Sequence, residues 1–165
     1  MDNKLLEGLN RQVNLELYSG YLYLAMSAYF SEIAMDGFAK TVMKQAKEEI
    51  SHAKRIYDYL LSRDEKIKLY EIDSPVNSFE SPLIAIKEAL SHEKVVSESI
   101  KELYELSKEV KDWASEIFLQ WFVEEQVEEE ENAMELLSKA KFADGDNRLM
   151  YELNKELGER SPSED

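Results

Sequence analysis

The chain has 165 residues and no cysteine, and 44% of its residues are hydrophobic. This length suffices for one domain with a sizeable core, and the missing cysteine excludes disulfides and thiolate metal sites. The formal net charge of −15 disfavours nucleic acid and anionic membranes as partners, and it attracts cations. No apolar run has the length of a signal peptide or a membrane span, so we expect a cytoplasmic protein without a membrane partner.

Two long helices are predicted in the first part of the chain. The first runs from about Asn3 to Ile33 and the second from about Asp36 to Arg63, with Asp36 as the N-cap. Because only the residues around Gly37 separate them, the two helices are expected to be antiparallel neighbours.

A segment without helical periodicity follows, from Asp64 to Ser81. Serine followed by Pro82 is a helix start signal, so a third helix is predicted from there to about Lys108. A fourth is predicted from about Trp113 to Phe142. Two antiparallel pairs joined by one long connection predict an all-α four-helix bundle with one long crossover.

A short fifth, C-terminal helix is predicted at about 147–157, followed by a frayed tail at 160–165. We expect residues 1–165 to form a single domain, with the bundle over about 3–142.

Each of the four long helices carries metal-type ligands in the middle of its apolar stripe. The stripes follow steps of three and four residues, which define one helix face. The ligands are Glu16 on the first helix, Glu49 and His52 on the second, Glu93 on the third, and Gln126 and Glu129 on the fourth. A lone buried carboxylate costs several kcal/mol unless it is paired, protonated or metal-bound. These stripes therefore predict a buried cation.

The depths of these ligands match. Glu16 lies 17 residues before Ile33 and Glu49 lies 16 residues after it, so the two sit at the same level of a hairpin. Four carboxylates and one imidazole suit iron(II) or manganese, with zinc also possible. Alone, the Glu49-x-x-His52 spacing is a weak signal in a glutamate-rich helix, and it gains weight from its partners.

Two further groups have an ambiguous pattern. His92 points about 100° away from Glu93 on the helix, which favours a surface or interface position over a metal ligand. The glutamate run at 124–131 is typical of a solvated face, yet part of it adjoins the stripe. The adjoining row could hold another cation; its members are Glu48, Glu125 and Glu128.

The first helix is apolar on more than one face, with Tyr21 and Leu24 among the residues outside the stripe. Such a helix is buried on several faces. Subunit contacts are the favoured explanation, and cover by the crossover segment is the alternative.

The chain resembles the prokaryotic (bacterial and archaeal) non-haem ferritins over essentially its whole length. The resemblance rests on "NLELYSGYLY" in the first helix, "QAKEEISHAKRIYDYL" in the second and "FLQWFVEEQVEEE" in the fourth. It implies an iron-storage protein with ferroxidase activity, which oxidises iron(II) with dioxygen or peroxide and deposits iron(III) mineral in a hollow homo-oligomeric shell, usually a 24-mer. Ferritin-like proteins are also the general example of di-iron sites built from Glu on two helices and i, i+3 pairs on the other two.

The resemblance also assigns roles to residues. Glu16, Glu49 and His52 would hold the first iron, while Glu49 would bridge to a second iron held by Glu93 and Glu129. Gln126 would lie beside the ligands without binding iron itself, and Glu48, Glu125 and Glu128, with Glu129, would form a third iron site. Tyr23 and Trp121 would serve as electron donors beside the centre.

The pattern departs from that of sister families. Bacterioferritins, rubrerythrins and ribonucleotide reductase small subunits carry a second Glu-x-x-His, whereas this chain has Gln126-x-x-Glu129. Ile50 stands where bacterioferritins place the haem-ligating methionine, so no haem is expected. The basic tail common in DNA-binding mini-ferritins is also missing.

Two other functions stay open at this point. A di-iron oxidase or peroxidase acting on a small molecule would use the same bundle and need no shell. A metal-free acidic adaptor would leave the buried carboxylates unexplained.

Overall fold

The structure is a computed structural model that describes residues 1–159, so the expected frayed tail at 160–165 lies outside the described part. Within that part the chain forms helices and no strand. The helices are α1 (Asn3–Glu32), α2 (Asp36–Ser62), α3 (Pro82–Glu109), α4 (Trp113–Ala143) and α5 (Asn147–Glu159). The predicted all-α class and helix order are confirmed, with bounds that differ by one or two residues. None of the helices within residues 1–159 is long and apolar enough to cross a membrane.

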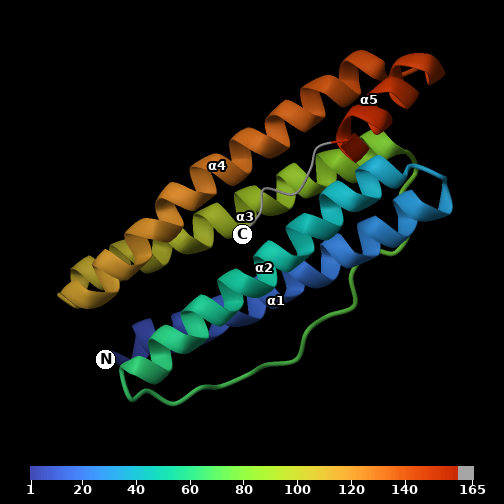
Figure 1. The fold of residues 1–165 in the computed structure, drawn as a ribbon. Helices are drawn as coiled ribbons and strands as arrows, with labels where there is room; N and C mark the ends of the chain where they lie inside the picture. Colours follow the sequence, from blue (N-terminus) through green and yellow to red (C-terminus); the bar gives the residue numbers. More distant parts are fainter. Residues whose placement is uncertain (160–165) are drawn as a thin grey trace.

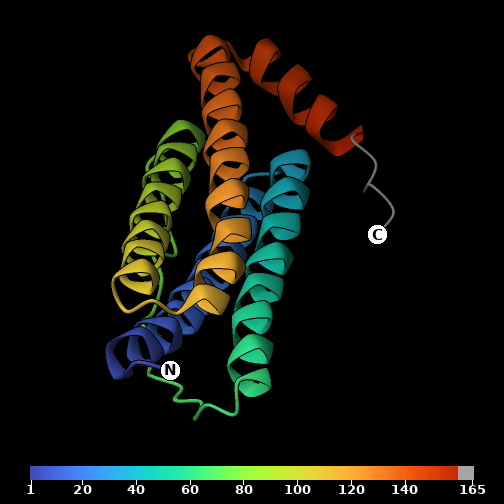
Figure 2. The ribbon, with the colours of Figure 1, turned by 90° about the vertical axis from the view of Figure 1, so that its left-hand side faces the viewer.

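The four long helices pack side by side as a bundle (Figure 1). α1 and α2 run antiparallel, as do α3 and α4, and the crossover between α2 and α3 runs along the bundle from one end to the other (Figure 1). α5 leaves the end of α4 at an angle and lies beside the start of α2 (Figure 2).

The predicted start of α3 is confirmed. The Ser81 hydroxyl accepts a hydrogen bond from the Ile84 amide at 3.3 Å, and Pro82 occupies the first helical position. Serine satisfies an amide that the helix leaves without a partner, and proline has no amide hydrogen to lose.

The prediction that Asp36 caps α2 is wrong. Asp36 is the first residue of α2, and the preceding Met35 provides no side-chain cap. Asn154 of α5 supplies the capping oxygen instead, since its Oδ1 accepts hydrogen bonds from the amides of Gly37 at 2.8 Å and Phe38 at 3.3 Å. A residue 117 positions away along the chain thus caps α2, whereas the sequence predicted a cap from the adjacent Asp36.

This contact requires a glycine at position 37. A Cβ atom there would lie 1.7 Å from the backbone oxygen of Asn154, and backbone cannot move aside as a flexible side chain can. We expect Gly37→Ala to lower the free energy of unfolding by about 2–4 kcal/mol, because it combines overpacking with loss of the cap. Chemical denaturation measures this, and Gly158→Ala, whose Cβ would meet its nearest atom at 3.5 Å, is the matched control.

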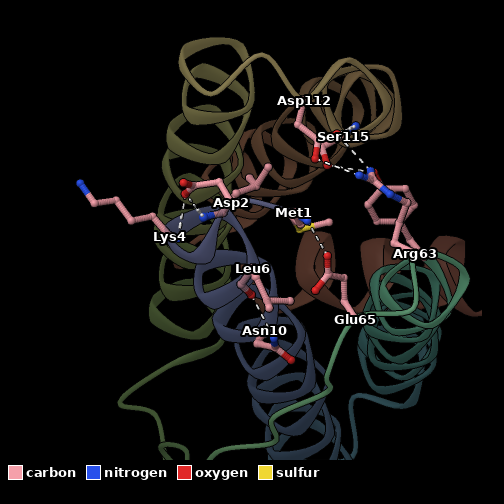
Figure 3. A network of polar contacts seen from close by, with 11 residues as sticks. Met1, Asp2, Lys4, Leu6, Asn10, Arg63, Glu65, Asp112 and Ser115 are labelled. Atoms are coloured by element: carbon pink, nitrogen blue, oxygen red, sulfur yellow. Dashed lines mark hydrogen bonds and ion pairs between the residues drawn. The ribbon is translucent and has the colours of Figure 1, made fainter.

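Polar contacts connect the crossover and the α3–α4 turn to the near end of the bundle (Figure 3). The Met1 ammonium group donates to Glu65 Oε1 at 2.7 Å, and the Lys68 amide of the crossover donates to Asn10 Oδ1 at 2.7 Å. The guanidinium of Arg63 forms two 3.0 Å bonds to the carboxylate of Asp112. Asp112 also caps α4 by accepting from the Ser115 amide at 3.1 Å. These bonds hold both pairs of helices together at this end.

The Arg63–Asp112 pair makes the free energy of unfolding depend on pH in the acid range. The hydrogen bonds from Arg63 lower the pKa of Asp112, so its stabilisation is present above the ordinary aspartate pKa and is lost as pH falls through the lowered value. We expect Asp112→Asn to lower the free energy of unfolding at pH 7 by about 1–3 kcal/mol. The difference from the unsubstituted protein should shrink toward pH 3 in urea denaturation; a constant difference would contradict this explanation.

Two apolar clusters fill the bundle and leave a polar layer between them. One includes Met26, Phe30 and Phe38, and the other includes Leu9 and Phe122. The mid-helix carboxylates lie in the gap. Apolar packing on both sides therefore fixes the helix positions from which these side chains project.

The crossover covers only part of the extra apolar surface of α1. Phe79 packs edge-on against Tyr29 at 5.1 Å between ring centroids, whereas Tyr21 remains 49% exposed and Leu24 40% exposed. On α2, Ile50, Tyr57 and Leu61 are also exposed. Both explanations offered by the sequence thus have support, each for a different part of the surface.

Candidate metal centre

The predicted ligands lie in one buried layer across all four long helices, but among residues 1–159 Glu93 is not part of any group of side chains that could hold a metal ion. Their relative exposures are 6% or less; the residues are Glu16, Glu49, His52, Glu93, Gln126 and Glu129. So complete a burial of carboxylates requires protons or a cation in their midst.

Glu16, Glu49 and His52 form a first group that could hold a metal ion, with one potential ligand atom from each within 4.8 Å of the others. His52 Nδ1 lies 3.5 Å from Glu49 Oε2. Within residues 1–159, two buried side-chain atoms have no hydrogen-bond partner, and they are Glu16 Oε2 and Glu49 Oε1. Buried polar atoms normally have a hydrogen-bond partner. A metal ion bound by both carboxylates would account for these two oxygens, because each would then have a ligand bond in place of a hydrogen bond.

His52, Glu125 and Glu129 form a second group of the same kind. His52 Nε2 lies 3.8 Å from Glu125 Oε1, so the imidazole presents one nitrogen to each group. Glu48 forms an ion pair with Lys44 at 3.2 Å, and Glu128 is exposed. Of the predicted acidic row, the structure thus brings Glu125 to the layer and leaves the other two at its rim.

Three glutamines surround the layer, and each donates its amide to a different carboxylate. Gln12 donates to Glu16 at 2.8 Å, Gln126 donates to Glu93 at 3.3 Å, and Gln45 donates to Glu129. No glutamine among residues 1–159 donates to Glu49, the predicted bridge.

Sequence reasoning missed Gln12 and Gln45 as residues of this layer. Gln45 lies on the apolar stripe of α2, and Gln12 stands four residues before Glu16. Side chains four residues apart contact each other on a helix, so the spacing between Gln12 and Glu16 is the sequence pattern that could have indicated Gln12.

Glu93 lies between two donors. Its Oε1 accepts from the hydroxyl of Tyr23, and its Oε2 accepts from Gln126. The Tyr23 ring is 3% exposed, and burial, followed by the charge of Glu93, raises the pKa of its phenol well above the ordinary value. Tyr23 thus remains a protonated hydrogen-bond donor, with Glu93 placed to accept its proton.

The carboxylates hold protons more tightly than exposed ones do. Burial, followed by the charge of Glu93, raises the pKa of Glu49 to about 9 and that of Glu129 to about 8. Burial, followed by the charge of Glu49, raises the pKa of Glu16 well above its usual range. A divalent cation would replace these protons, because it neutralises several carboxylates at once.

Trp121 and His92 lie beside the layer in different ways. The Trp121 ring packs edge-on against the His52 ring, with 5.5 Å between the ring centroids. The guanidinium of Arg55 lies over the Trp121 ring, 3.9 Å from the ring centroid. His92 is half-buried, with Nε2 2.7 Å from the Ser19 hydroxyl, and it belongs to neither ligand group. Its burial lowers the pKa of the imidazole to about 4.

The donor set is mainly carboxylate oxygen with one imidazole nitrogen, which suits iron(II) or manganese(II), with zinc also possible. Fold and site together define a four-helix-bundle protein whose interior carries carboxylate-rich groups that could hold metal ions.

Comparison with known proteins identifies the family. The ferritin-like domain family matches residues 6–143. The chain is 37% identical to a bacterial non-heme ferritin of Staphylococcus haemolyticus, over 100% of this chain and 99% of the relative, and 38% identical to one of Staphylococcus epidermidis, over 99% of each. An open pore ferritin from the hyperthermophilic archaeon Archaeoglobus fulgidus superimposes with a TM-score of 0.95 at 40% identity, over 98% of this chain and 99% of that one. The chain belongs to the ferritin family, and family and fold support iron storage as its role.

Proposed function

We propose that this protein is a ferroxidase that stores iron. The observation that carries the proposal is the pair of unpartnered buried oxygens on Glu16 and Glu49, in a layer where His52 already faces both ligand groups. Glu16, Glu49 and His52 bind the first iron(II), and Glu49 bridges to a second held by Glu93 and Glu129. Iron is the substrate here, and no haem takes part.

The chemistry follows from the charge of the layer. Each of two iron(II) ions gives up one electron, and dioxygen takes both electrons with two protons to leave as hydrogen peroxide; peroxide is the alternative oxidant. Carboxylates favour the iron(III) state because they stabilise its extra positive charge in a buried site. Tyr23 and Trp121 are proposed to donate one electron each when the peroxide is reduced further, with two protons, to two molecules of water. For Tyr23 the carboxylate of Glu93 accepts the phenolic proton.

Iron(III), the product, leaves the buried layer through the second ligand group, which contains Glu125 and Glu129. Glu125 and Glu129, together with Glu48 and Glu128 at the rim, are proposed as a third iron site from which iron(III) moves to the mineral. Glu125 is only partly buried, with 28% of its side chain exposed, so this group links the buried layer to the surface.

The mineral requires a compartment, which we propose is a homo-oligomeric shell of 24 subunits in the cytoplasm. The exposed apolar side chains on α1 and α2 support contacts between copies of the chain. Gel filtration should give a particle many times the chain mass of 19.2 kDa. A monomer or dimer would favour a di-iron enzyme that acts on a small molecule.

Iron oxidation tests the activity directly. Iron(II) is added in air to metal-free protein, and ferric absorbance is followed against the iron-to-protein ratio. We expect a fast phase that saturates at about two irons per chain, followed by slower growth of soluble mineral. Oxidation no faster than in protein-free buffer, with precipitation, would refute the proposal.

A further inference from the structure

Gln12 makes contacts that no role assigned so far explains. Its side chain is 1% exposed and lies one helical turn before Glu16 on α1. Its Nε2 donates to Glu16 Oε1 at 2.8 Å, and its Oε1 accepts from the hydroxyl of Ser99 on α3. A chain of hydrogen bonds therefore runs from α3 through Gln12 to the carboxylate of Glu16.

The carboxylate of Glu16 fixes which end of the Gln12 amide faces it, and the Ser99 hydroxyl satisfies the other end. When a metal ion has replaced its proton, the carboxylate of Glu16 can only accept hydrogen bonds, so the Gln12 nitrogen then has to face Glu16. The amide oxygen then faces the opposite way, where the Ser99 hydroxyl donates to it. Both ends of the amide are satisfied in this orientation, and a flipped amide would place two acceptors against each other.

The two oxygens of Glu16 consequently have different surroundings. Oε1 is engaged by Gln12, whereas Oε2 is buried and unpartnered and belongs to a residue of the first ligand group. A carboxylate oxygen that accepts an N–H bond is a weaker ligand than its free neighbour, because part of its electron density is already shared.

We infer that Gln12, anchored by Ser99, is a positioning residue that makes Glu16 a monodentate ligand through Oε2. A ligand that supplies one oxygen rather than two leaves a coordination position open on the first metal ion. In the proposed ferroxidase this position is available to the oxidant. The inference rests on the proposed metal site and does not depend on oxidation.

The test uses cobalt(II) as the probe, since its visible absorption is stronger at four or five ligands than at six. In Gln12→Met, a side chain of similar shape without donor or acceptor replaces the amide. We expect the affinity for the first cobalt(II) to fall about 10–100-fold, as is typical when a partner of a metal ligand is removed. We also expect the visible absorption to weaken, because Glu16 is then free to bind through both oxygens.

The chain offers a matched control. Gln120 donates to Glu124 at 3.0 Å with the same four-residue spacing, but both side chains are exposed on α4. Gln120→Met should leave cobalt(II) affinity and absorption unchanged. Ser99→Ala, which retains Gln12 but removes its anchor, should change both in the direction of Gln12→Met and by a smaller amount.

The outcomes separate this inference from the proposed function. Gln12→Met with the affinity and spectrum of the unsubstituted protein would overturn the inference and leave the metal site intact. Weaker binding with a lower melting temperature and an unchanged spectrum would also overturn it, since the substitution would then only have loosened the helix. Failure of the unsubstituted protein to bind cobalt(II) would instead refute the metal site itself.

Discussion

Replacing Glu49 with alanine is expected to abolish the fast phase of iron oxidation while the fold remains intact. Of the four buried mid-helix glutamates, Glu49 is the one that receives no amide from a glutamine in the described part of the chain, and its Oε1 is unpartnered. Oε1 is thus free to bind one ion, and we propose that Oε2, which lies 3.5 Å from His52 Nδ1, binds the other. Loss of the bridge should lower the initial rate by at least about 100-fold, since removal of mere outer partners costs 10–100-fold.

The helix itself should tolerate the substitution. Alanine has the highest helix propensity, and Glu49→Ala removes a buried carboxylate whose charged form is disfavoured there. Stopped-flow absorbance gives the rate, and circular dichroism gives the helix content. The matched control is Glu102→Ala, at an exposed position on α3. Glu49→Ala oxidising iron at the unsubstituted rate would show that the site has been assigned to the wrong residues.

The sequence predicts the ligand layer well because helical geometry is local. Steps of three and four residues place Glu49 and His52 on one face, and a short turn near Gly37 sets Glu16 at the same depth. The structure brings these three residues into one potential metal-binding group. Periodicity and turn length alone therefore sufficed to predict that these three side chains come together.

The partners of the ligands depend on contacts between distant segments, which a single sequence does not display. Ser99 reaches Gln12 across 87 positions, and Asn154 reaches the start of α2 across 117. The capping prediction failed for this reason: Asp36 has a residue type that caps helices but occupies the first helical position of α2, and Asn154 of α5 provides the cap. Gln45 lies four residues before Glu49 in the sequence, but only the fold shows that its amide contacts Glu129.

The metal-free protein is expected to lose stability as pH rises. This is the opposite of the contribution of Asp112, which is lost as pH falls. Glu49 and Glu129, with pKa values of about 9 and about 8, bind protons more tightly in the folded chain than the ordinary glutamate value of 4.5 allows. A raised pKa stabilises the folded state fully below the ordinary value, and this stabilisation is lost as pH rises through 8 and 9. Between pH 6 and pH 9 the loss should be about 2 kcal/mol or more, given about 1.4 kcal/mol for each pKa unit.

A bound metal ion should remove this pH dependence, because it replaces the protons. Zinc(II) is a suitable probe, since it fits carboxylate and imidazole ligands and is not oxidised in air. Calorimetry at pH 7 in buffers of different ionisation enthalpy should show the release of more than one proton per chain on zinc binding. Thermal unfolding should show that zinc stabilises the protein more at pH 9 than at pH 6. The variant with Glu49→Gln and Glu129→Gln has lost both groups, so the same proton release from it would place the titrating carboxylates elsewhere.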